Sequence, residues 1–186
     1  MHELLTSLIT VVLAELGDKT QLLALLLAAR FKKPIPIILG ITVATLLNHT
    51  FASLIGVWLA SLINPPTLRL ILAFVFIAMG IWICIPDKID EAQLKITNSL
   101  NIFVTTSMVF FLAEMGDKTQ IATVALAAHY QAPLLVIVGT PLGMLAADIP
   151  AVLIGNTFAQ HLPLRLIRIV AALIFITIGV VSLIYQ

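Results

Sequence analysis

Two segments of the sequence carry the same pattern of acidic, basic and amide side chains within apolar surroundings. Ala14–Gln21 reads AELGDKTQ and Ala113–Gln120 reads AEMGDKTQ. Carboxylate and amide oxygens are hard ligands that suit Mg²⁺, Ca²⁺ or Mn²⁺. A carboxylate that ligates a metal must first be deprotonated, so the same groups could bind a divalent cation or protons. The candidate metal ligands are the acids and amides of both segments and one further acid: Glu15, Asp18, Gln21, Glu114, Asp117, Gln120 and Asp148.

The spacing within each segment predicts how these groups would lie on a continuous helix. Residues three apart share a helix face, so Glu15 and Asp18 are expected on one face, with Gln21 continuing it. Lys19 follows Glu15 by four residues and is expected to flank this face and to pair with Glu15. Further residues are predicted to support the site: Lys19, Lys118, Thr20, Thr119, Asn48, His49 and Ala146.

Two of the predicted supporting roles follow from the chemistry of particular residues. Pro150 lacks an N–H, so it frees the carbonyl of Ala146, which lies within a turn of Asp148. Thr20 and Thr119 could each offer a hydroxyl oxygen, although threonines in membrane helices often bond back to their own helix.

The composition places these polar groups in a membrane protein. The chain has 186 residues, of which 61% are hydrophobic and only 10% charged, and its mean hydropathy is +1.14. Soluble domains are about 45–50% apolar and about 25% charged. The formal net charge of +1 gives no basic face for nucleic acid. We therefore expect an integral protein of the lipid bilayer.

Six apolar runs are long enough to cross a bilayer, which takes about 17–25 residues each. The runs are Glu3–Ala29, Pro34–Ile63, Leu68–Ile85, Ile102–Ala128, Pro133–Leu162 and Leu164–Tyr185. The polar segment 86–101 joins the third run to the fourth. The sequence thus predicts an all-α integral membrane protein with six transmembrane helices.

The two halves of the chain are related by an internal repeat. Shifting the sequence by 99 residues aligns the two acidic segments and also Gly40 with Gly139 and Arg69 with Arg168. Residues 1–85 and 102–186 would each hold three spans, with 86–101 as the linker. Three spans per repeat make the second copy cross the membrane in the opposite sense. Such inverted repeats are typical of transporters, whose substrate site lies at the midplane.

The lysines and arginines predict the orientation of the chain. Seven of the ten lie beside the first, third and fifth connections: Arg30, Lys32, Lys33, Lys88, Lys95, Arg165 and Arg168. The opposite side carries Arg69 alone. Positively charged connections face the cytoplasm. We therefore expect the linker inside, both termini outside the cytoplasm, and location in the cell (inner) membrane.

The acidic groups would lie near the middle of the spans. Each ionised group costs about 2.5–3.5 kcal/mol to insert at a helix centre. Five acids against Lys19 and Lys118 leave an excess of negative charge that mutual pairing cannot neutralise, whereas a bound cation can. This excess disfavours a purely structural polar core. Zinc or copper would call for several His and Cys, but only His49 is central, and Met144 is expected to pack rather than to ligate.

The doubled motif resembles a known family. Glu15–Thr20 and Glu114–Thr119 both match the E-x-G-D-[KR]-[TS] signature of Gdt-type cation/proton exchangers, which include bacterial Mne-type manganese exporters. The resemblance covers essentially the whole chain. It implies export of Mn²⁺, with Ca²⁺ as a second candidate, in exchange for H⁺, and no cofactor. The cation-binding roles would fall to Glu15, Asp18, Glu114 and Asp117.

Three other functions are alternatives to the exchanger. A passive divalent-cation channel would need a continuous pore and would ignore a proton gradient. An intramembrane aspartyl protease uses a Gly-x-Gly-Asp motif, but Glu15 and Glu114 stand where its first glycine should be. An amino-acid exporter would need unpaired cationic groups. The exchanger is favoured because metal and protons would compete for the same acids.

Overall fold

The computed structural model describes residues 1–85, 101–130, 132–154 and 164–184. Every regular element within these residues is an α-helix, which confirms the all-α prediction. The predicted linker, apart from Asn101, lies outside the described residues. So do residues 155–163, which were expected to end the fifth span at Leu162 and connect it to the sixth, and Tyr185 at the predicted end of the sixth span.

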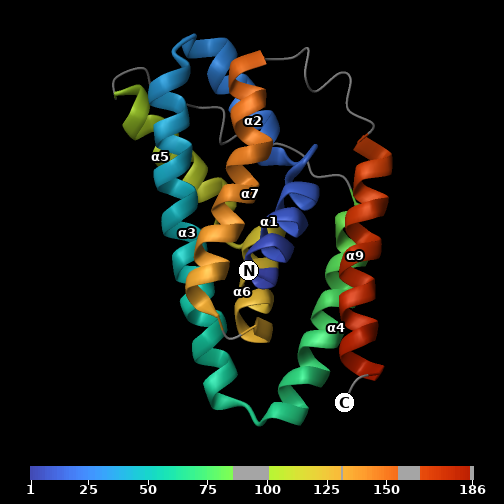
Figure 1. The fold of residues 1–186 in the computed structure, drawn as a ribbon. Helices are drawn as coiled ribbons and strands as arrows, with labels where there is room; N and C mark the ends of the chain where they lie inside the picture. Colours follow the sequence, from blue (N-terminus) through green and yellow to red (C-terminus); the bar gives the residue numbers. More distant parts are fainter. Residues whose placement is uncertain (86–100, 131, 155–163, 185–186) are drawn as a thin grey trace.

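Each half of the chain has the same succession of two short helices, a long helix and a final helix (Figure 1). The first half has α1 (His2–Glu15), α2 (Lys19–Phe31), α3 (Pro34–Leu62) and α4 (Pro65–Ile83). The second has α5 (Ile102–Glu114), α6 (Lys118–Tyr130), α7 (Pro133–Ile154) and α9 (Leu164–Ile184). In Figure 1, α3 descends through the view, whereas α7 ascends beside it. The equivalent helices of the two halves therefore run in opposite directions.

Prolines open three of the longer helices. Pro34, Pro65 and Pro133 are the first residues of α3, α4 and α7. Proline suits this position because its missing N–H would have no partner within the helix, and its fixed φ is already helical. The helix before α3, which is α2, ends where Lys32 adopts the left-handed conformation with φ 53°. Local sequence thus sets where these helices begin and end.

Within the described residues, four helices are long and apolar enough to cross a membrane, and they correspond to four of the six predicted spans. They comprise Pro34–Leu62, Pro65–Ile83, Pro133–Leu153 and Arg165–Ile184. The prediction of continuous helices for the first and fourth spans is wrong. Each of these is two short helices, because α1 ends at Glu15 and α5 ends at Glu114, inside the acidic motifs.

The motif glycine breaks each of these two helices. Gly17 has φ 80° and Gly116 has φ 75°, a left-handed conformation that glycine adopts without steric penalty. The residues before them, Leu16 and Met115, are extended, with ψ of 114° and 115°. The apolar length of the runs predicted continuity, but a single backbone reversal overrides it in both halves. Gly17 is buried, whereas Gly116 is exposed. Non-helical backbone at membrane depth is tolerated where it is buried in protein or lines a water-filled cavity.

The short helices of each half pack against the long helix of the other half. α1 lies along α7, and α5 lies along α3. Glycines permit these approaches at equivalent positions of the repeat. A Cβ at Gly40 of α3 would lie 2.7 Å from the Cβ of Thr106 in α5, and one at Gly139 of α7 would lie 2.7 Å from the carbonyl oxygen of Leu4 in α1. The two halves are therefore interlocked.

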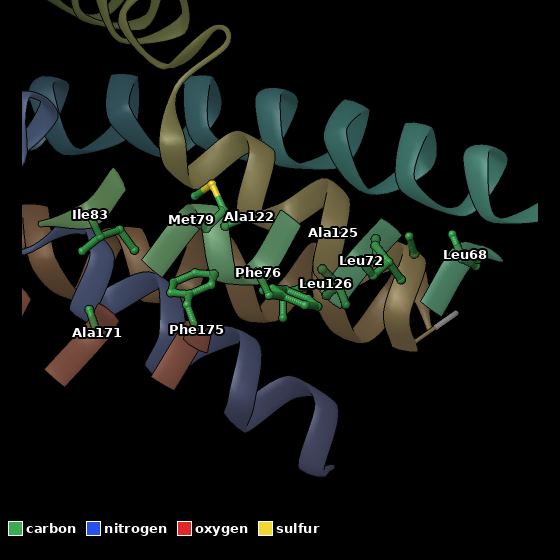
Figure 2. Packing of buried hydrophobic residues seen from close by; sticks show 13 residues of the cluster. Leu68, Leu72, Phe76, Met79, Ile83, Ala122, Ala125, Leu126, Ala171 and Phe175 are labelled. Carbon is green, nitrogen blue, oxygen red and sulfur yellow. The ribbon is translucent and has the colours of Figure 1, made fainter. Parts of the chain in front are cut away.

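A separate apolar core joins α4, α6 and α9 (Figure 2). Phe76 of α4 and Phe175 of α9 are fully buried, with ring centroids 6.2 Å apart, and Leu126 of α6 packs in the same cluster. The outer surfaces of α3, α4 and α9 expose many large apolar side chains, among them Trp58, Phe74 and Leu173. Such a surface would be a liability in water and suits contact with lipid.

Candidate metal centre

The same turn is built at both motifs. The side-chain oxygen of Gln21 accepts a hydrogen bond from the backbone N–H of Gly17, at 2.9 Å. Gln120 accepts the equivalent bond from Gly116. Both glutamine oxygens, which were predicted as metal ligands, are therefore engaged in holding the glycine turn. This contact explains why an amide stands four residues after each glycine.

The break also separates the two acids of each motif. Glu15 is the last residue of α1, whereas Asp18 is the N-cap of α2, so the two do not share one helix face as predicted. Glu114 likewise ends α5 and Asp117 precedes α6. The expectation failed because it assumed a helical path between the two acids. The left-handed glycine turns the chain between them.

The five predicted acids are nevertheless brought into one buried region. Glu15, Glu114 and Asp148 are fully buried, and Asp18 and Asp117 are 6% and 4% exposed. The carboxylates of Asp148, Asp18, Asp117 and Glu114 all lie close enough to Glu15 to repel it electrostatically. The tertiary fold therefore gathers acidic side chains of both halves in the protein interior.

The motif lysines cross from one half to the other. Lys19 Nζ lies 2.9 Å from Oδ1 of Asp117, and Lys118 Nζ lies 4.0 Å from Oδ1 of Asp18. The structure thus gives Lys19 the aspartate of the opposite motif, where Glu15 was expected. The reason is again the turn at Gly17, which carries Lys19 onto a new helix.

The two lysines differ in their other contacts. Lys118 Nζ donates a hydrogen bond to the carbonyl oxygen of Ile85 at 2.9 Å and lies 5.9 Å from the centre of the Trp82 ring. The Lys118 side chain is 4% exposed, whereas that of Lys19 is 21% exposed. The two equivalent lysine–aspartate pairs therefore differ in distance and in exposure within one structure.

The two motif glutamates also have unlike surroundings. Thr45 and Asn48 of α3 donate to the two carboxylate oxygens of Glu114, at 3.0 and 3.2 Å. Within the described part of the chain, neither oxygen of Glu15 and neither oxygen of Asp148 has a hydrogen-bond partner. The sequence analysis had not identified Thr45. Its position three residues before Asn48, on the same face of α3, is the signal that could have found it.

The other residues that were predicted to support the site agree only partly with the structure. Thr20 and Thr119 are buried, and no described group bonds to their hydroxyls. Ala146 is an exposed residue of α7, and the carbonyl that Gln21 reaches is that of Ala147, at 3.1 Å. The sequence had placed Arg168 in the repeat alignment and in the charge count but not at the site, yet its Nη2 donates to the carbonyl oxygen of Gly17 at 3.0 Å.

In this structure the described acids do not form a compact metal site. Among the residues that the structure describes, no three histidine, cysteine or acidic side chains are gathered closely enough to hold a metal ion. Instead, a lysine ammonium group lies against one oxygen of Asp117. The chemistry of the region is nonetheless that of hard oxygen ligands around a buried centre, which suits protons and divalent cations.

Comparison with known proteins shows which family the chain belongs to. The family profile described as "Divalent cation/proton antiporter GDT1" matches residues 3–91 and 102–186, one segment in each half. The chain belongs to the GDT1 family. It is therefore a membrane transporter for divalent cations and not an enzyme, which excludes the aspartyl protease considered above. The resemblance inferred from the doubled motif is confirmed.

Individual GDT1 relatives extend over nearly the whole chain. The "Putative manganese exporter" of Vibrio cholerae is 50% identical over 183 residues, covering 98% of this chain and 90% of the relative. "GDT1-like protein 5" of Arabidopsis thaliana is 28% identical over 216 residues, covering 95% and 93%. "GDT1-like protein 3" of Oryza sativa subsp. indica is 27% identical over 207 residues, covering 98% and 74%. No solved structure shows significant similarity to the chain.

Proposed function

We propose that this GDT1 protein exports Mn²⁺ from the cytoplasm in exchange for protons, with Ca²⁺ as a possible second substrate. The 50% identity to a protein named as a putative manganese exporter supports the choice of Mn²⁺. The oxygen-rich acidic centre suits either cation. The acids of the two motifs and Asp148 would bind the transported ion, with the motif glutamines bracing the turns that present them.

The observation that carries the proposal is the environment of Glu15 and Asp148. Both are fully buried, and their four carboxylate oxygens have no hydrogen-bond partner among the described residues. An isolated ionised carboxylate away from water is strongly disfavoured unless something neutralises it. Either a proton or a cation can do so. Because a ligating carboxylate must be deprotonated, metal and protons exclude each other, and that exclusion is the exchange.

The lysines would supply the release step. The Lys19 ammonium group occupies Asp117 of the opposite motif and so competes with a metal for that carboxylate. The equivalent pair, Lys118 with Asp18, is looser at 4.0 Å. In transporters with inverted repeats, the two halves exchange conformations as access alternates. We expect the opposite state to close the Lys118–Asp18 pair and to open the Lys19–Asp117 pair.

The proposed topology has six crossings, arranged as repeats 1–85 and 102–186 that lie inverted in the inner membrane. The opposite directions of α3 and α7 support this arrangement (Figure 1). In it, α1 with α2 and α5 with α6 are two discontinuous spans, of the kind whose broken centres bind ions in other transporters. Both termini would lie outside the cytoplasm, with residues 86–101 inside.

Flux measurements in liposomes test the exchange. The purified chain would be reconstituted with Mn²⁺ on one side and an imposed pH gradient. We expect uphill Mn²⁺ movement driven by the gradient, with protons moving in the opposite direction. Mn²⁺ flux that only follows its own gradient and is indifferent to pH would identify a passive channel. Unchanged cell manganese after deletion of the gene, under manganese load, would contradict export.

A further inference from the structure

A nitrogen atom and a sulfur atom face each other beside the acidic centre. Nε2 of His49 in α3 lies 3.2 Å from Sδ of Met144 in α7. Both side chains are fully buried. The other ring nitrogen of His49, Nδ1, lies 2.9 Å from Oγ1 of Thr123 in α6. Three helices thus converge on the imidazole.

The hydrogen bonds of Thr123 indicate which nitrogen of His49 carries the proton. Thr123 donates its single hydroxyl hydrogen to the carbonyl oxygen of Thr119, at 2.8 Å. Its oxygen is then an acceptor for His49, so Nδ1 carries the hydrogen. Nε2 is left with a lone pair, and the thioether of Met144 likewise has only lone pairs to offer. This is the way a metal-binding histidine is usually held, with its other N–H bonded to the protein.

The spacing of the two atoms fits one shared ion. Bonds from a first-row metal of about 2.1 Å to nitrogen and about 2.3 Å to sulfur, set at a right angle, separate those atoms by about 3.1 Å. Two lone pairs at 3.2 Å with no hydrogen between them make a poor packing contact but a ready pair of ligands. The soft sulfur and the imidazole favour transition metals, whereas Ca²⁺ and Mg²⁺ prefer oxygen alone.

Along α3 and α7, the pair lies within one helical turn of residues of the acidic region. Met144 precedes Asp148 by one turn on α7, and both are fully buried. On α3, His49 follows Asn48, which donates to Glu114. His49 and Asp148 occupy equivalent positions of the repeat, as do Thr45 and Met144. The two long helices therefore offer, one turn apart, a hydroxyl and an imidazole on one side and a thioether and a carboxylate on the other.

We propose that His49 Nε2 and Met144 Sδ form a nitrogen–sulfur ligand pair that selects transition-metal cations over Ca²⁺ and Mg²⁺. This inference rests on the proposed function, because it names the element of the transport site that distinguishes among divalent cations. It gives Met144 a role beyond the packing that the sequence suggested. The acids would supply charge and proton exchange, while this pair would supply preference for Mn²⁺.

Met144→Leu is the direct test, with Met79→Leu as its matched control. Met79 is 2% exposed in the apolar core of α4, α6 and α9, so the control makes the same change away from the acids. The full chain in liposomes would be assayed for Mn²⁺ transport in competition with Ca²⁺. We expect Met144→Leu to reduce the preference for Mn²⁺ by about ten-fold, mainly through a higher KM for Mn²⁺. Met79→Leu should leave the preference unchanged.

A sulfur-seeking probe separates ligation from packing. Cd²⁺ should inhibit Mn²⁺ transport by the wild type, and the inhibition should weaken in Met144→Leu and His49→Gln. Met144→Cys restores a sulfur atom and should restore sensitivity to Cd²⁺, which also covers the case in which the leucine variant does not fold. Equal losses of Mn²⁺ and Ca²⁺ transport, or an unchanged preference in Met144→Leu, would overturn the proposal.

The failure of this inference can be distinguished from failure of the proposed function. Metal binding to the detergent-purified chain does not depend on transport. Mn²⁺ electron paramagnetic resonance would measure binding of Mn²⁺ and its displacement by Cd²⁺. If the wild type binds Mn²⁺ but does not exchange it for protons, the transport proposal fails while the ligand pair is still tested. If Met144→Leu binds both metals as the wild type does, the ligand pair is wrong.

Discussion

Lys19 Nζ lies 2.9 Å from Oδ1 of Asp117, so a lysine of the first motif neutralises an aspartate of the second. The Asp117 side chain is 4% exposed. Removing one partner of a buried pair leaves an uncompensated charge, which is why such pairs are sensitive to substitution. Here the pair joins the two halves of the chain at the point where the proposed ion must bind. In the proposed mechanism, metal binding and contact between the halves would be linked through this one carboxylate.

Lys19→Gln should alter affinity more than coupling. Without the ammonium group, Asp117 is available to the metal, so the KM for Mn²⁺ should fall about five-fold, equivalent to about 1 kcal/mol. The maximal rate should also fall, because release loses its competitor. Initial rates in liposomes measure both, with Lys32→Gln, an exposed residue beyond α2, as the control. A raised KM, or flux that no longer responds to the pH gradient, would contradict this role.

Asp18→Asn and Asp117→Asn should each abolish transport. An amide keeps the size of the side chain but neither releases a proton nor supplies negative charge. Mn²⁺ uptake driven by a pH gradient is the measurement, and Glu3→Gln is the control, since Glu3 pairs with the N-terminal amino group at the opposite end of α1 from Glu15. An Asp18→Asn protein that still accumulates Mn²⁺ would show that this acid is dispensable.

Thr45→Val should destabilise the protein, whereas Thr42→Val should not do so to the same extent. Thr45 donates to the buried carboxyl group of Glu114, and leaving a buried acceptor without its donor costs about 1–3 kcal/mol. Thr42 lies on the same helix, but its hydroxyl bonds to the carbonyl of Ile38 in its own helix. Thermal unfolding in detergent compares the two variants. Equal shifts in melting temperature would contradict a special role for Thr45.

Gly116→Ala should cost more stability than Gly116→Asn. No described atom lies within 4 Å of a Cβ built at Gly116, so space is not the obstacle. The obstacle is φ of 75°, which costs a residue with a Cβ about 1–2 kcal/mol. Asparagine visits this conformation more readily than alanine does. Melting temperatures of the two variants in detergent test this order, and equal losses would point to a cause other than backbone strain.

Single cysteines should report the proposed topology in a Cys84→Ser background. Lys33→Cys lies in the connection before α3, and Thr67→Cys lies in the first turn of α4 at the other end of α3; both positions are exposed. We expect a membrane-impermeant thiol reagent on intact cells to label residue 67 but not residue 33. Labelling of residue 33 from outside would reverse the orientation inferred from the lysines and arginines.

Much of the architecture could be predicted because it depends on composition and repetition. Apolar length predicted four continuous helices that the structure contains, and prolines marked where three of them begin. The 99-residue repeat predicted that each element of one half would have a counterpart in the other. Burial of the five acids followed from their place within apolar runs. These features can be predicted from the order and type of the residues alone.

The details of the site required the tertiary structure. A glycine within an apolar run is compatible with a helix, so nothing local required Gly17 to reverse the backbone and end α1. That reversal decides that Lys19 meets Asp117 and that the amide oxygen of Gln21 holds a turn. Glu114 meets the donors Thr45 and Asn48 of α3. The equivalent positions of α7 are Met144 and Ala147, whose side chains cannot donate a hydrogen bond to Glu15. The sequence alone determined which groups enter the membrane, because burial of apolar surface acts residue by residue. Only the packing of one half against the other decided which of those groups meet, because contacts between distant segments depend on where the backbone turns.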